Sequence, residues 1–477
     1  MRDNIAMNLF PVFKMKTLAL AVLASLLSAC AVGPAYQRPD DPQPERFRHA
    51  PDQVQESPSE WWRGFNDPLM TQLVEQALTA NQDIAQALGR IKQAQAWTRR
   101  ARAERLPMGD ISAQTGRRHD SLESPQGRVS QDSPAFERSY DTHEASLGAS
   151  WELDLFGRLR RQSQAAQARY DQATAEWHGV RVAVAAETAD AYLLLVQANQ
   201  QRALLHRQLE NQRQAVTLDQ QRFDAQVIAI ADLRRTQAAQ ASLEAELPGL
   251  EQLIDAQRNR LAVLIGQNPT AFDLPVLPDR LPESPSLPGF EQPGALLRTR
   301  PDVMAAEQRL IAATAQVGAT MAGYYPSLSL SGVLGLQATT GGAFTSGDAV
   351  NAAGLLGLRW RLFDFARVDA EIRQAQGQRA EALAAYRQTL LQATEDVENA
   401  LFARLTSQQE AASKQHEAER LGDACKAQQE SWQARQASRL TAIMAEQQWL
   451  SAKRFAWASD GHAARAQIRL YKAVGKV

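Results

Sequence analysis

The residues best suited to catalysis or metal binding are scattered along this sequence. None of the seven histidines belongs to an HExxH motif or an i, i+4 pair: His49, His119, His143, His178, His206, His416 and His462. The two cysteines form no CxxC motif, and no Walker loop, GxGxxG or GxSxG is present. We therefore expect no catalytic residue, no metal site and no enzyme activity.

Cys30 is the residue whose setting indicates a covalent modification. Two lysines precede the apolar run Thr17–Leu27, which is too short to cross a bilayer but suits a signal-peptide core. The run ends in Leu27-Ser28-Ala29-Cys30, which resembles the box at which bacterial lipoproteins are processed and acylated. We expect residues 1–29 to be a signal peptide and Cys30 to carry covalent lipid, the only cofactor-like group. The alternative is an ordinary secretory signal followed by a stray cysteine.

Four charged residues alternate with apolar ones in two stretches. Glu152 and Asp154 lie between Trp151, Leu153 and Leu155, and the run from Leu356 to Leu362 contains Arg359 and Arg361 in the same way. A period of two over about ten residues is typical of a transmembrane strand with one apolar and one polar face. We predict one β-hairpin in each half, at about 107–156 and 326–364. A soluble β-sandwich is the alternative, but two hairpins alone cannot build one.

The elements recur because the sequence contains two copies of one pattern. Asn81–Ala96 aligns with Arg300–Ala315, Pro107 with Pro326, and Trp151–Arg158 with Trp360–Arg367. The offset is 219 residues at Pro107 and 209 residues at Trp151, so an insertion separates the two landmarks. The first of the two predicted surface loops, 116–142 against 338–351, is the longer. We expect a tether over residues 30–60, one repeat over 61–280 and a second over 281–477.

Long helices are predicted after each hairpin. No proline occurs in 158–247 or after Pro326, and good helix formers dominate both stretches. Leu383, Tyr386, Leu390, Ala393, Val397 and Ala400 follow the 3, 4 spacing of a coiled-coil seam. We predict helical hairpins at about 158–266 and 366–473. A helix over residues 158–223 would be about 100 Å long, and its charged surface excludes lipid.

Four strands cannot close a barrel, so the unpaired edges must be satisfied by other copies of the chain. A trimer would supply twelve strands, and the polar face of the sheet, with Glu152, Asp154, Arg359 and Arg361, would line a hydrated pore. Trp151 and Trp360 are expected either at the membrane interface or as filling of the barrel-to-helix junction, with equal weight. The predicted fold class is mainly α with a membrane β-barrel contribution, internally duplicated.

The sequence resembles the TolC-like outer-membrane efflux proteins, specifically the lipoprotein branch that serves tripartite RND-type multidrug systems. The matching segments cover most of the chain: Cys30–Pro39, Trp61–Trp62, Asp67–Leu69, Trp151–Arg158, Ala189–Leu193, Leu261–Gly266 with Pro269, Arg300–Asp302 with Ala306–Glu307, Tyr325–Ser327 and Leu470–Ala473.

The resemblance implies a homotrimer in the outer membrane of a Gram-negative bacterium, with a twelve-stranded barrel and a long periplasmic α-helical tunnel. It implies a passive duct that exports small molecules received from an inner-membrane RND-type pump and a periplasmic adaptor. Outer-membrane lipid is the other expected partner. A formal net charge of −1 gives no reason to expect nucleic acid.

Three other functions compete with this interpretation. A duct for type I protein secretion or for metal ions is the alternative within the same class, although no histidine or methionine cluster favours metal. A periplasmic coiled-coil adaptor would lack the duplicated strand hairpins and carry a lipoyl-like β module. An enzyme is disfavoured by the scattered reactive residues.

The turns of the two helical hairpins depart from the family pattern. The resemblance implies adaptor contact at Gln226, Val227 and Asp232 in the first turn and at Arg435, Gln436 and Thr441 in the second. Gln226 and Arg435 stand where the family has glycine, which tolerates positive φ at little cost, whereas other residues lose about 1–2 kcal/mol there. Either the turns take another conformation, or the contact with the adaptor differs.

Overall fold

The computed structural model describes residues 32–41, 45–50, 59–134, 136–273, 275–285 and 293–476. The expected signal peptide and Cys30 lie outside the described residues. The elements, in chain order, are η1 (Trp61–Phe65), α2 (Pro68–Ala80), α3 (Gln82–Ala103), β1 (Met108–His119), α4 (Pro125–Ser130), β2 (Ser139–Leu153), α5 (Arg158–Asp224), α6 (Ile230–Leu264), η2 (Pro269–Ala271), α7 (Pro293–Thr299), α8 (Pro301–Met321), η3 (Ala322–Tyr324), β3 (Ser327–Ala338), η4 (Gly347–Ala349), β4 (Val350–Arg359), α9 (Phe365–Gln433) and α10 (Arg439–Val474).

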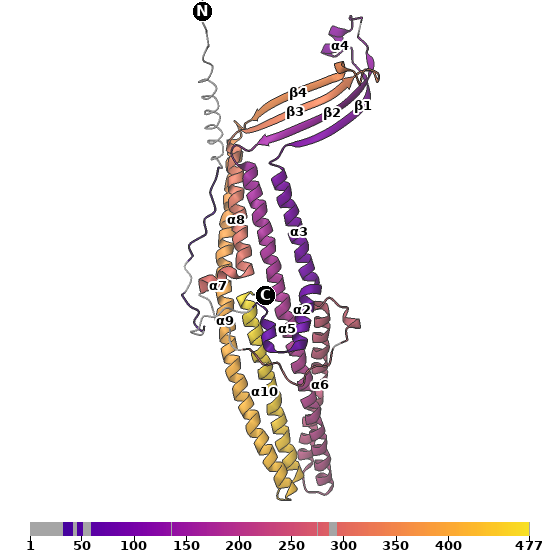
Figure 1. Cartoon of the computed structure of the whole chain (residues 1–477). Helices are drawn as coiled ribbons and strands as arrows, with labels where there is room; N and C mark the ends of the chain where they lie inside the picture. The colour runs from indigo at the N-terminus through magenta and orange to yellow at the C-terminus, as the bar shows by residue number, and fades with distance from the viewer. Residues whose placement is uncertain are drawn as a thin grey trace, which may run out of the picture. The chain divides into compact units, whose positions relative to one another are not determined.

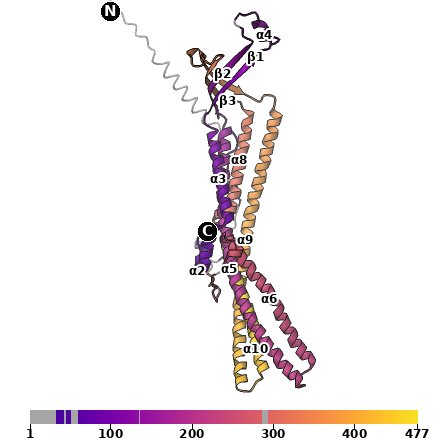
Figure 2. The ribbon, with the colours of Figure 1, turned by 90° about the vertical axis from the view of Figure 1, so that its right-hand side faces the viewer.

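Over the described residues the fold is mainly helical with a four-stranded sheet, as the sequence predicts (Figure 1). The predicted long helices are present as the pairs α5–α6 and α9–α10, each joined by a short turn (Figure 2). Four residues of the predicted seam on α9 are buried: Tyr386, Leu390, Ala393 and Val397. Among the helices in the described ranges, none combines the length and the apolarity that a membrane crossing requires.

The chain divides into two compact units, and each takes segments from both halves of the sequence. The first contains the whole sheet and is formed from residues 1–39, 92–171 and 308–384. The second is formed from residues 40–91, 172–307 and 385–477. The two sequence repeats and the two compact units therefore partition the chain differently.

The sheet has the strand order β1-β2-β3-β4, and every neighbouring pair is antiparallel. Met108 pairs with Ser150 in the first hairpin, and Ser327 pairs with Arg359 in the second. Both pairs are related by the offsets read from the sequence, 219 for the first strand and 209 for the second. The two hairpins therefore share one register.

Both predicted hairpins extend a few residues beyond the ends of the observed strands. β2 ends at Leu153 and β4 ends at Arg359, so Asp154 and Arg361 follow the strands rather than belonging to them. β4 stops because β3 begins at Ser327, whose partner is Arg359, and residues 360–362 have no neighbouring strand within the chain. Alternation of residue types continues past a strand that ends for lack of a partner.

The second unit has its core around two adjacent tryptophans. Trp61 and Trp62 are almost fully buried, and the Trp61 ring stacks on Tyr471 of α10 with centroids 5.1 Å apart. Asp67 begins α2 by accepting a hydrogen bond from the Met70 backbone N–H, and its other oxygen accepts one from the Tyr192 hydroxyl at 2.8 Å. Burial and the Asp67 carboxylate raise the pKa of Tyr192 above its ordinary value.

Residues 32–41 form neither helix nor strand, and the first of them are held against neighbouring segments of the sheet-bearing unit. The Val32 N–H donates to the Phe156 carbonyl, and Arg161 donates to the carbonyls of Val32 and Gly33. Gly33 has φ +96°, and a Cβ added there would lie 2.4 Å from Cα of Gly318 on α8. The two glycines thus permit a close backbone contact that no side chain allows.

Alanine at Gly33 or Gly318 should release this segment. The added Cβ would meet backbone in the first case, and Nε of Arg161 at 2.9 Å in the second. We expect faster hydrogen exchange in residues 32–39 of the purified protein for both variants. Gly377→Ala on α9 is the matched control, because a Cβ there meets nothing within 4 Å. Equal exchange in all three variants would contradict the contact.

Candidate functional site

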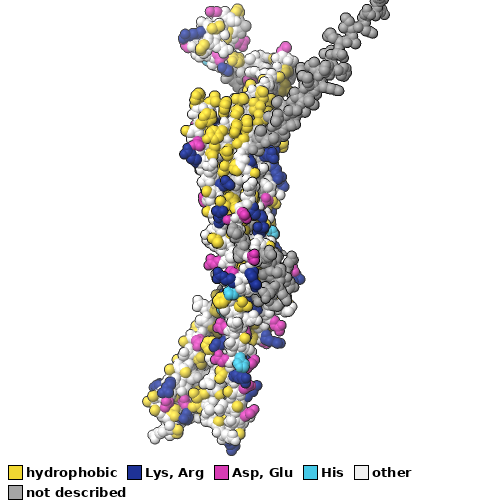
Figure 3. All heavy atoms as spheres, turned by 90° about the vertical axis from the view of Figure 1, so that its left-hand side faces the viewer, with side chains coloured by type: hydrophobic (Ala, Val, Ile, Leu, Met, Phe, Trp, Pro, Cys, Tyr) yellow, Lys and Arg dark blue, Asp and Glu magenta, His cyan; other side chains and the backbone are white. Residues whose placement is uncertain are grey.

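The sheet is amphipathic across all four strands, because the register places apolar residues on one face. The apolar face consists of Ile111 and Ala113 on β1, Ala145, Leu147, Ala149, Trp151 and Leu153 on β2, Leu328, Leu330, Leu334 and Leu336 on β3, and Val350, Ala352, Leu356 and Leu358 on β4. Many of these side chains are exposed, Ile111 to 82% and Leu358 to 66%. Figure 3 shows a broad group of hydrophobic side chains on the sheet-bearing part of the chain. So much exposed apolar surface indicates a face that meets lipid or another apolar partner.

The opposite face carries polar side chains that bond to one another across the strands. Ser112 and Ser146 share a hydrogen bond of 2.9 Å, and Glu144 accepts from both Gln114 on β1 and Gln337 on β3. These side chains are exposed. The polar face is therefore suited to contact water while the apolar face contacts lipid.

Two of the four predicted pore residues lie on this polar face. Glu152 is paired with Ser329 in the β2–β3 ladder, and Arg359 with Ser327 in the β3–β4 ladder. The Glu152 carboxylate forms an ion pair of 2.7 Å with Arg158 in the first turn of α5. Whether these residues line a pore depends on assembly and remains a prediction.

The other two connect strands to helices. Asp154 accepts hydrogen bonds from the backbone N–H groups of Leu159 and Arg160, so its carboxylate caps the start of α5. Arg361 binds Asp364 at 2.8 Å and Glu371 at 3.2 Å, just before and within the first turns of α9. Strand alternation alone therefore does not place these two side chains.

Trp151 and Trp360 make equivalent contacts in the two repeats. The Trp151 indole N–H donates to the Arg105 carbonyl, and the Trp360 indole N–H donates to the Tyr324 carbonyl, both at 3.0 Å. Each bond links the end of a hairpin to the residues just before its first strand. Both rings are partly exposed, so filling of the strand-to-helix junction and a place at a membrane interface are compatible.

The turns at the ends of the helical hairpins keep the conformation that glycine would favour. Gln226 has φ +59° and Arg435 has φ +61°. In the first turn the N–H groups of Val227 and Gln226 donate to the carbonyls of Arg222 and Phe223. The second turn repeats this pattern with Gln436 and Arg435, which identifies both as Schellman motifs. Of the two possibilities left by the sequence, a changed turn conformation is therefore wrong.

The two turns differ in the helix that follows them. The Ser438 hydroxyl caps α10 by accepting a hydrogen bond from the Thr441 N–H at 3.1 Å. The equivalent residue before α6 is Ala229, whose side chain makes no capping hydrogen bond. Asp232 lies in the first turn of α6, where its charge is favourable, and it faces Arg235 at 3.3 Å. Gln226, Val227, Arg435, Gln436 and Thr441 are exposed, and Asp232 is half-buried. The exposed groups of the two turns are therefore chemically distinct.

Glycine at Gln226 or at Arg435 should stabilise its turn. The left-handed conformation is costless for glycine and costs other residues about 1 kcal/mol after allowance for glycine's greater freedom when unfolded. We expect slower hydrogen exchange of the turn amides in Gln226→Gly and Arg435→Gly. Ala225→Gly is the control, since Ala225 does not have positive φ. Faster exchange in the two turn variants would contradict this account.

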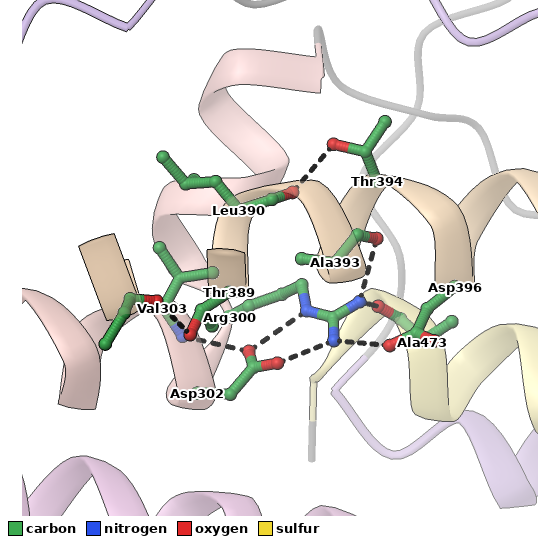
Figure 4. Close-up of polar contacts among 10 residues, drawn as sticks. Arg300, Asp302, Val303, Thr389, Leu390, Ala393, Thr394, Asp396 and Ala473 are labelled. Carbon is green, nitrogen blue, oxygen red and sulfur yellow. Dashed lines mark hydrogen bonds and ion pairs between the residues drawn. The ribbon is translucent and has the colours of Figure 1, made fainter. Parts of the chain in front are cut away.

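A buried arginine that the sequence marked only as part of a motif joins three helices of the second unit (Figure 4). Arg300 donates to the carbonyls of Ala393 on α9 and Ala473 at the end of α10, and forks onto Asp302 at 3.1 and 2.7 Å. Asp396 accepts a further bond at 3.1 Å. Burial alone would lower the pKa of Arg300, but the bonds and charges of Asp302 and Asp396 outweigh it and raise the pKa.

The equivalent residue in the first repeat is Asn81. Its amide donates to the Leu264 carbonyl at 2.9 Å, just as Arg300 donates to Ala473, and Leu264 and Ala473 are equivalent by the offset of 209. Each helix end is closed by a glycine with positive φ, Gly266 and Gly475. Aligning the two sequence repeats places polar Asn81 opposite polar Arg300, and this match could have indicated the Arg300 site.

Polar side chains of α10 also bind α5 along its length. Arg465 forms a two-bond ion pair with Asp190, at 2.7 and 2.9 Å, and Gln447 donates to the Gln208 carbonyl. Near the turns, Arg439 lies over the Trp432 ring and donates to Gln214. Sequence reasoning missed the pairs between α5 and α10, since their members are separated by more than 200 positions. They hold the two helical hairpins of one chain together.

Comparisons with known proteins agree with this geometry. The family model described as outer membrane efflux protein matches twice, over residues 73–267 and 293–476. Outer membrane protein OprJ of Pseudomonas aeruginosa is 30% identical over 412 residues, 84% of this chain and 82% of OprJ. A probable outer membrane lipoprotein of Salmonella typhimurium, SilC, is 25% identical over 84% of this chain and 86% of its own length. The solved structure of the outer-membrane channel OprN is 31% identical with a TM-score of 0.81, and covers 94% of this chain and 99% of that one.

Proposed function

The chain belongs to the outer membrane efflux protein family, and on this premise we propose that it is the outer-membrane duct of a tripartite efflux system. Its relatives and structural neighbours are channels rather than enzymes. The observation that carries the proposal is the sheet, which has one apolar face, one polar face and two unpaired edge strands.

Assembly follows from those edges. An isolated four-stranded sheet leaves the outer N–H and C=O groups of β1 and β4 unpaired, and such groups are very costly in lipid. Three copies would supply twelve strands and close a barrel with the apolar face toward lipid and Glu152 and Arg359 toward water. In this homotrimer the polar face forms the wall of a passive pore. Its side chains can exchange hydrogen bonds with water and with passing solutes.

The partners proposed are a periplasmic adaptor and an inner-membrane RND-type pump, with small molecules or drugs as the exported substrate. The exposed turn residues around Gln226 and Arg435 are the proposed adaptor contact. Their exposure and distinct chemistry support this, because the two turns of one chain can offer an adaptor two different surfaces. Export of proteins in a type I system or of metal ions is the second candidate.

The proposed location is the outer membrane of a Gram-negative bacterium, with an acylated Cys30. Residue 31 is not aspartate, which fits sorting to that membrane. The docking of Val32 at Phe156 supports an anchor near the sheet, since only one residue separates Val32 from Cys30 and Phe156 follows β2 closely. Several acyl chains would make the attachment stable.

Purification in detergent and recording in a planar bilayer test the duct. We expect a trimer that resists dissociation and conducts ions. A monomer without conductance would refute the proposal. Loss of drug resistance on deletion of the gene, restored by the wild-type chain, would separate the multidrug role from the protein-secretion and metal alternatives.

Cys30→Ala tests the lipid. We expect the variant to lose the mass of the acyl chains and to shift toward the aqueous phase in detergent partitioning of its N-terminal fragment, because chain anchoring scales with buried CH₂ groups. Unchanged mass and unchanged partitioning would show that Cys30 is not acylated.

A further inference from the structure

A pocket with a volume of about 330 Å³ lies in the sheet-bearing unit, where side chains of α3, α5 and α8 come together. This volume is at the lower end of the range for small-molecule sites, about 300–1,000 Å³. The short side chains of Ala94 and Ala165, both buried, leave the space open. Six larger residues surround it: Trp97, Arg100, Glu104, Gln162, Arg169 and Gln316.

Trp97 gives the pocket an aromatic surface that is free to bind. Its side chain is 61% exposed, although tryptophan is among the residues that gain most from burial. Among the residues that the structure describes, no aromatic ring and no cation stacks on the Trp97 indole. One face of this ring is therefore available to a planar partner.

The pocket also has one uncompensated positive charge. Nε of Arg100 lies 3.1 Å from Oε1 of Glu104, so these two charges cancel. Arg169 is exposed, and within the described ranges its guanidinium forms no ion pair. A guanidinium beside an indole matches a planar aromatic molecule with an anionic group, since the ring can stack and the anion can accept charge-assisted hydrogen bonds.

The second repeat shows that the fold does not require these residues. The offsets of 219 and 209 pair three lining residues of the first repeat with residues of the second: Trp97 with Gln316, Arg100 with Ala319 and Arg169 with Gln378. The two repeats share the same helices and the same strand register, so a role in folding would apply to both copies. Only the first copy has the aromatic and cationic residues, which favours a role in binding.

The pocket opens away from the N-terminal segment, which packs on the same two helices. Ala35 and Tyr36 share a second pocket with residues of α5 and α8. On α5 the two sides are lined by different residues: Arg161, Gln164, Gln167, Ala168 and Asp171 near the N-terminal segment, and Gln162, Ala165, Ala166 and Arg169 in the Trp97 pocket. At 3.6 residues per turn these two sets are centred about 150° apart around the helix. In the proposed duct, whose lipid anchor is outside, the Trp97 pocket would face the interior.

We propose that this pocket binds small planar aromatic anions, which stack on Trp97 and bond through their anionic group to Arg169. The site goes beyond the proposed function and rests on it only for the source of the ligand, a solute in transit through the duct. Because Trp97 and Arg169 are exposed, a bound solute stays partly in water and can leave again.

Equilibrium dialysis of the purified chain in detergent against 2-naphthoate tests the site. Trp97→Gln and Arg169→Gln introduce the residues of the second repeat, which the same backbone already accommodates. We expect each to weaken binding about tenfold, because one removes the stacking surface and the other the charged donor. Arg99→Gln is the matched control, since Arg99 is exposed on α3 but does not line the pocket.

Two further ligands separate the ring from the charge. We expect 2-naphthamide, which lacks the charge, and cyclohexanecarboxylate, which lacks the aromatic ring, to bind the wild-type chain more weakly than 2-naphthoate. Equal uptake by the wild type and Trp97→Gln would mean that the ligand enters only the detergent. An equal loss in Arg99→Gln would mean that net charge alone attracts it. Either result would overturn the site.

A thiol in the pocket tests whether the site is open in the assembled protein. Ala101→Cys, in a Cys425→Ser background, places a cysteine in the lining. We expect a water-soluble maleimide to modify it in the purified trimer, and 2-naphthoate to slow this reaction about fivefold. No modification would show that a second copy covers the pocket, and an unchanged rate would show that the ligand binds elsewhere; both overturn the proposal.

The binding site and the duct can fail separately. Trimers that conduct but do not bind 2-naphthoate would overturn the site and leave the proposed function intact. A chain that binds 2-naphthoate at Trp97 but neither trimerises nor conducts would count against the duct alone.

Discussion

Arginine in place of Leu356 should keep the protein out of the outer membrane, whereas arginine in place of Leu355 should not. The two leucines are neighbours on β4 with nearly equal exposure, 64% and 65%. Leu356 pairs with Leu330 on the apolar face, and Leu355 pairs with Ser331 on the polar face. An arginine facing lipid near the middle of a barrel strand costs about 2–4 kcal/mol, and each trimer would contain three.

The measurement is the yield of heat-resistant trimer in the outer-membrane fraction, with folding into lipid vesicles as a second readout. Leu355→Arg is the matched control. It introduces the same charge at the adjacent residue, so only the face of the sheet that carries the arginine differs. We expect a large loss for Leu356→Arg and a nearly normal yield for Leu355→Arg. The reverse order would show that the apolar face lines the pore, and equal yields would show that neither face meets lipid.

Arg300→Ala should strongly destabilise the helical part of the chain. The guanidinium is buried and supplies donors to two carbonyls and two carboxylates on three helices. Asp302 and Asp396 are about half exposed, so water compensates part of their loss. Hydrogen bonds that involve charged groups contribute about 1.5–3 kcal/mol, and we expect a loss of about 2–3 kcal/mol. The midpoint of unfolding, followed by circular dichroism, measures it.

Arg298→Ala is the control, since Arg298 lies two residues earlier on α7 and is exposed. Surface substitutions usually change stability by less than about 0.5 kcal/mol. Arg300→Lys should recover only part of the loss, because an ammonium cannot reproduce the planar fork that binds Asp302. Full recovery by lysine would mean that charge alone matters, and an unchanged midpoint in Arg300→Ala would mean that the contacts contribute nothing.

Local features were predictable because they depend on residues close together in sequence. The sequence placed Gln226 and Arg435 where glycine would favour positive φ but left the turn conformation open, and the Schellman bonds that fix it connect groups only three and five positions apart. The start of α2 at Asp67 is equally local, since its carboxylate bonds three residues ahead. Alternation and heptad spacing identified the strands and the buried seam for the same reason.

The length of β4 and the places of Asp154 and Arg361 were not predictable in this way. A strand continues only where a neighbouring strand supplies hydrogen-bond partners. For β4 that neighbour is β3, and the first residue of β3, Ser327, is the partner of Arg359. Asp154 was assigned to a strand face because its residue type fits the alternation, but the backbone of α5 offers its carboxylate two N–H donors.

Residue order alone was enough to predict two equivalent halves, an amphipathic hairpin and a pair of long helices in each half, and turns that lack glycine. These properties are periodic or local, so each copy expresses them without the other. Three sets of contacts could be seen only in the folded chain: those of Arg300 with α9 and α10, those of α10 with α5, and the pairing of β2 with β3 in one register. Each of those contacts joins residues more than 90 positions apart or belongs to a ladder between the halves, and only folding brings such groups within bonding distance.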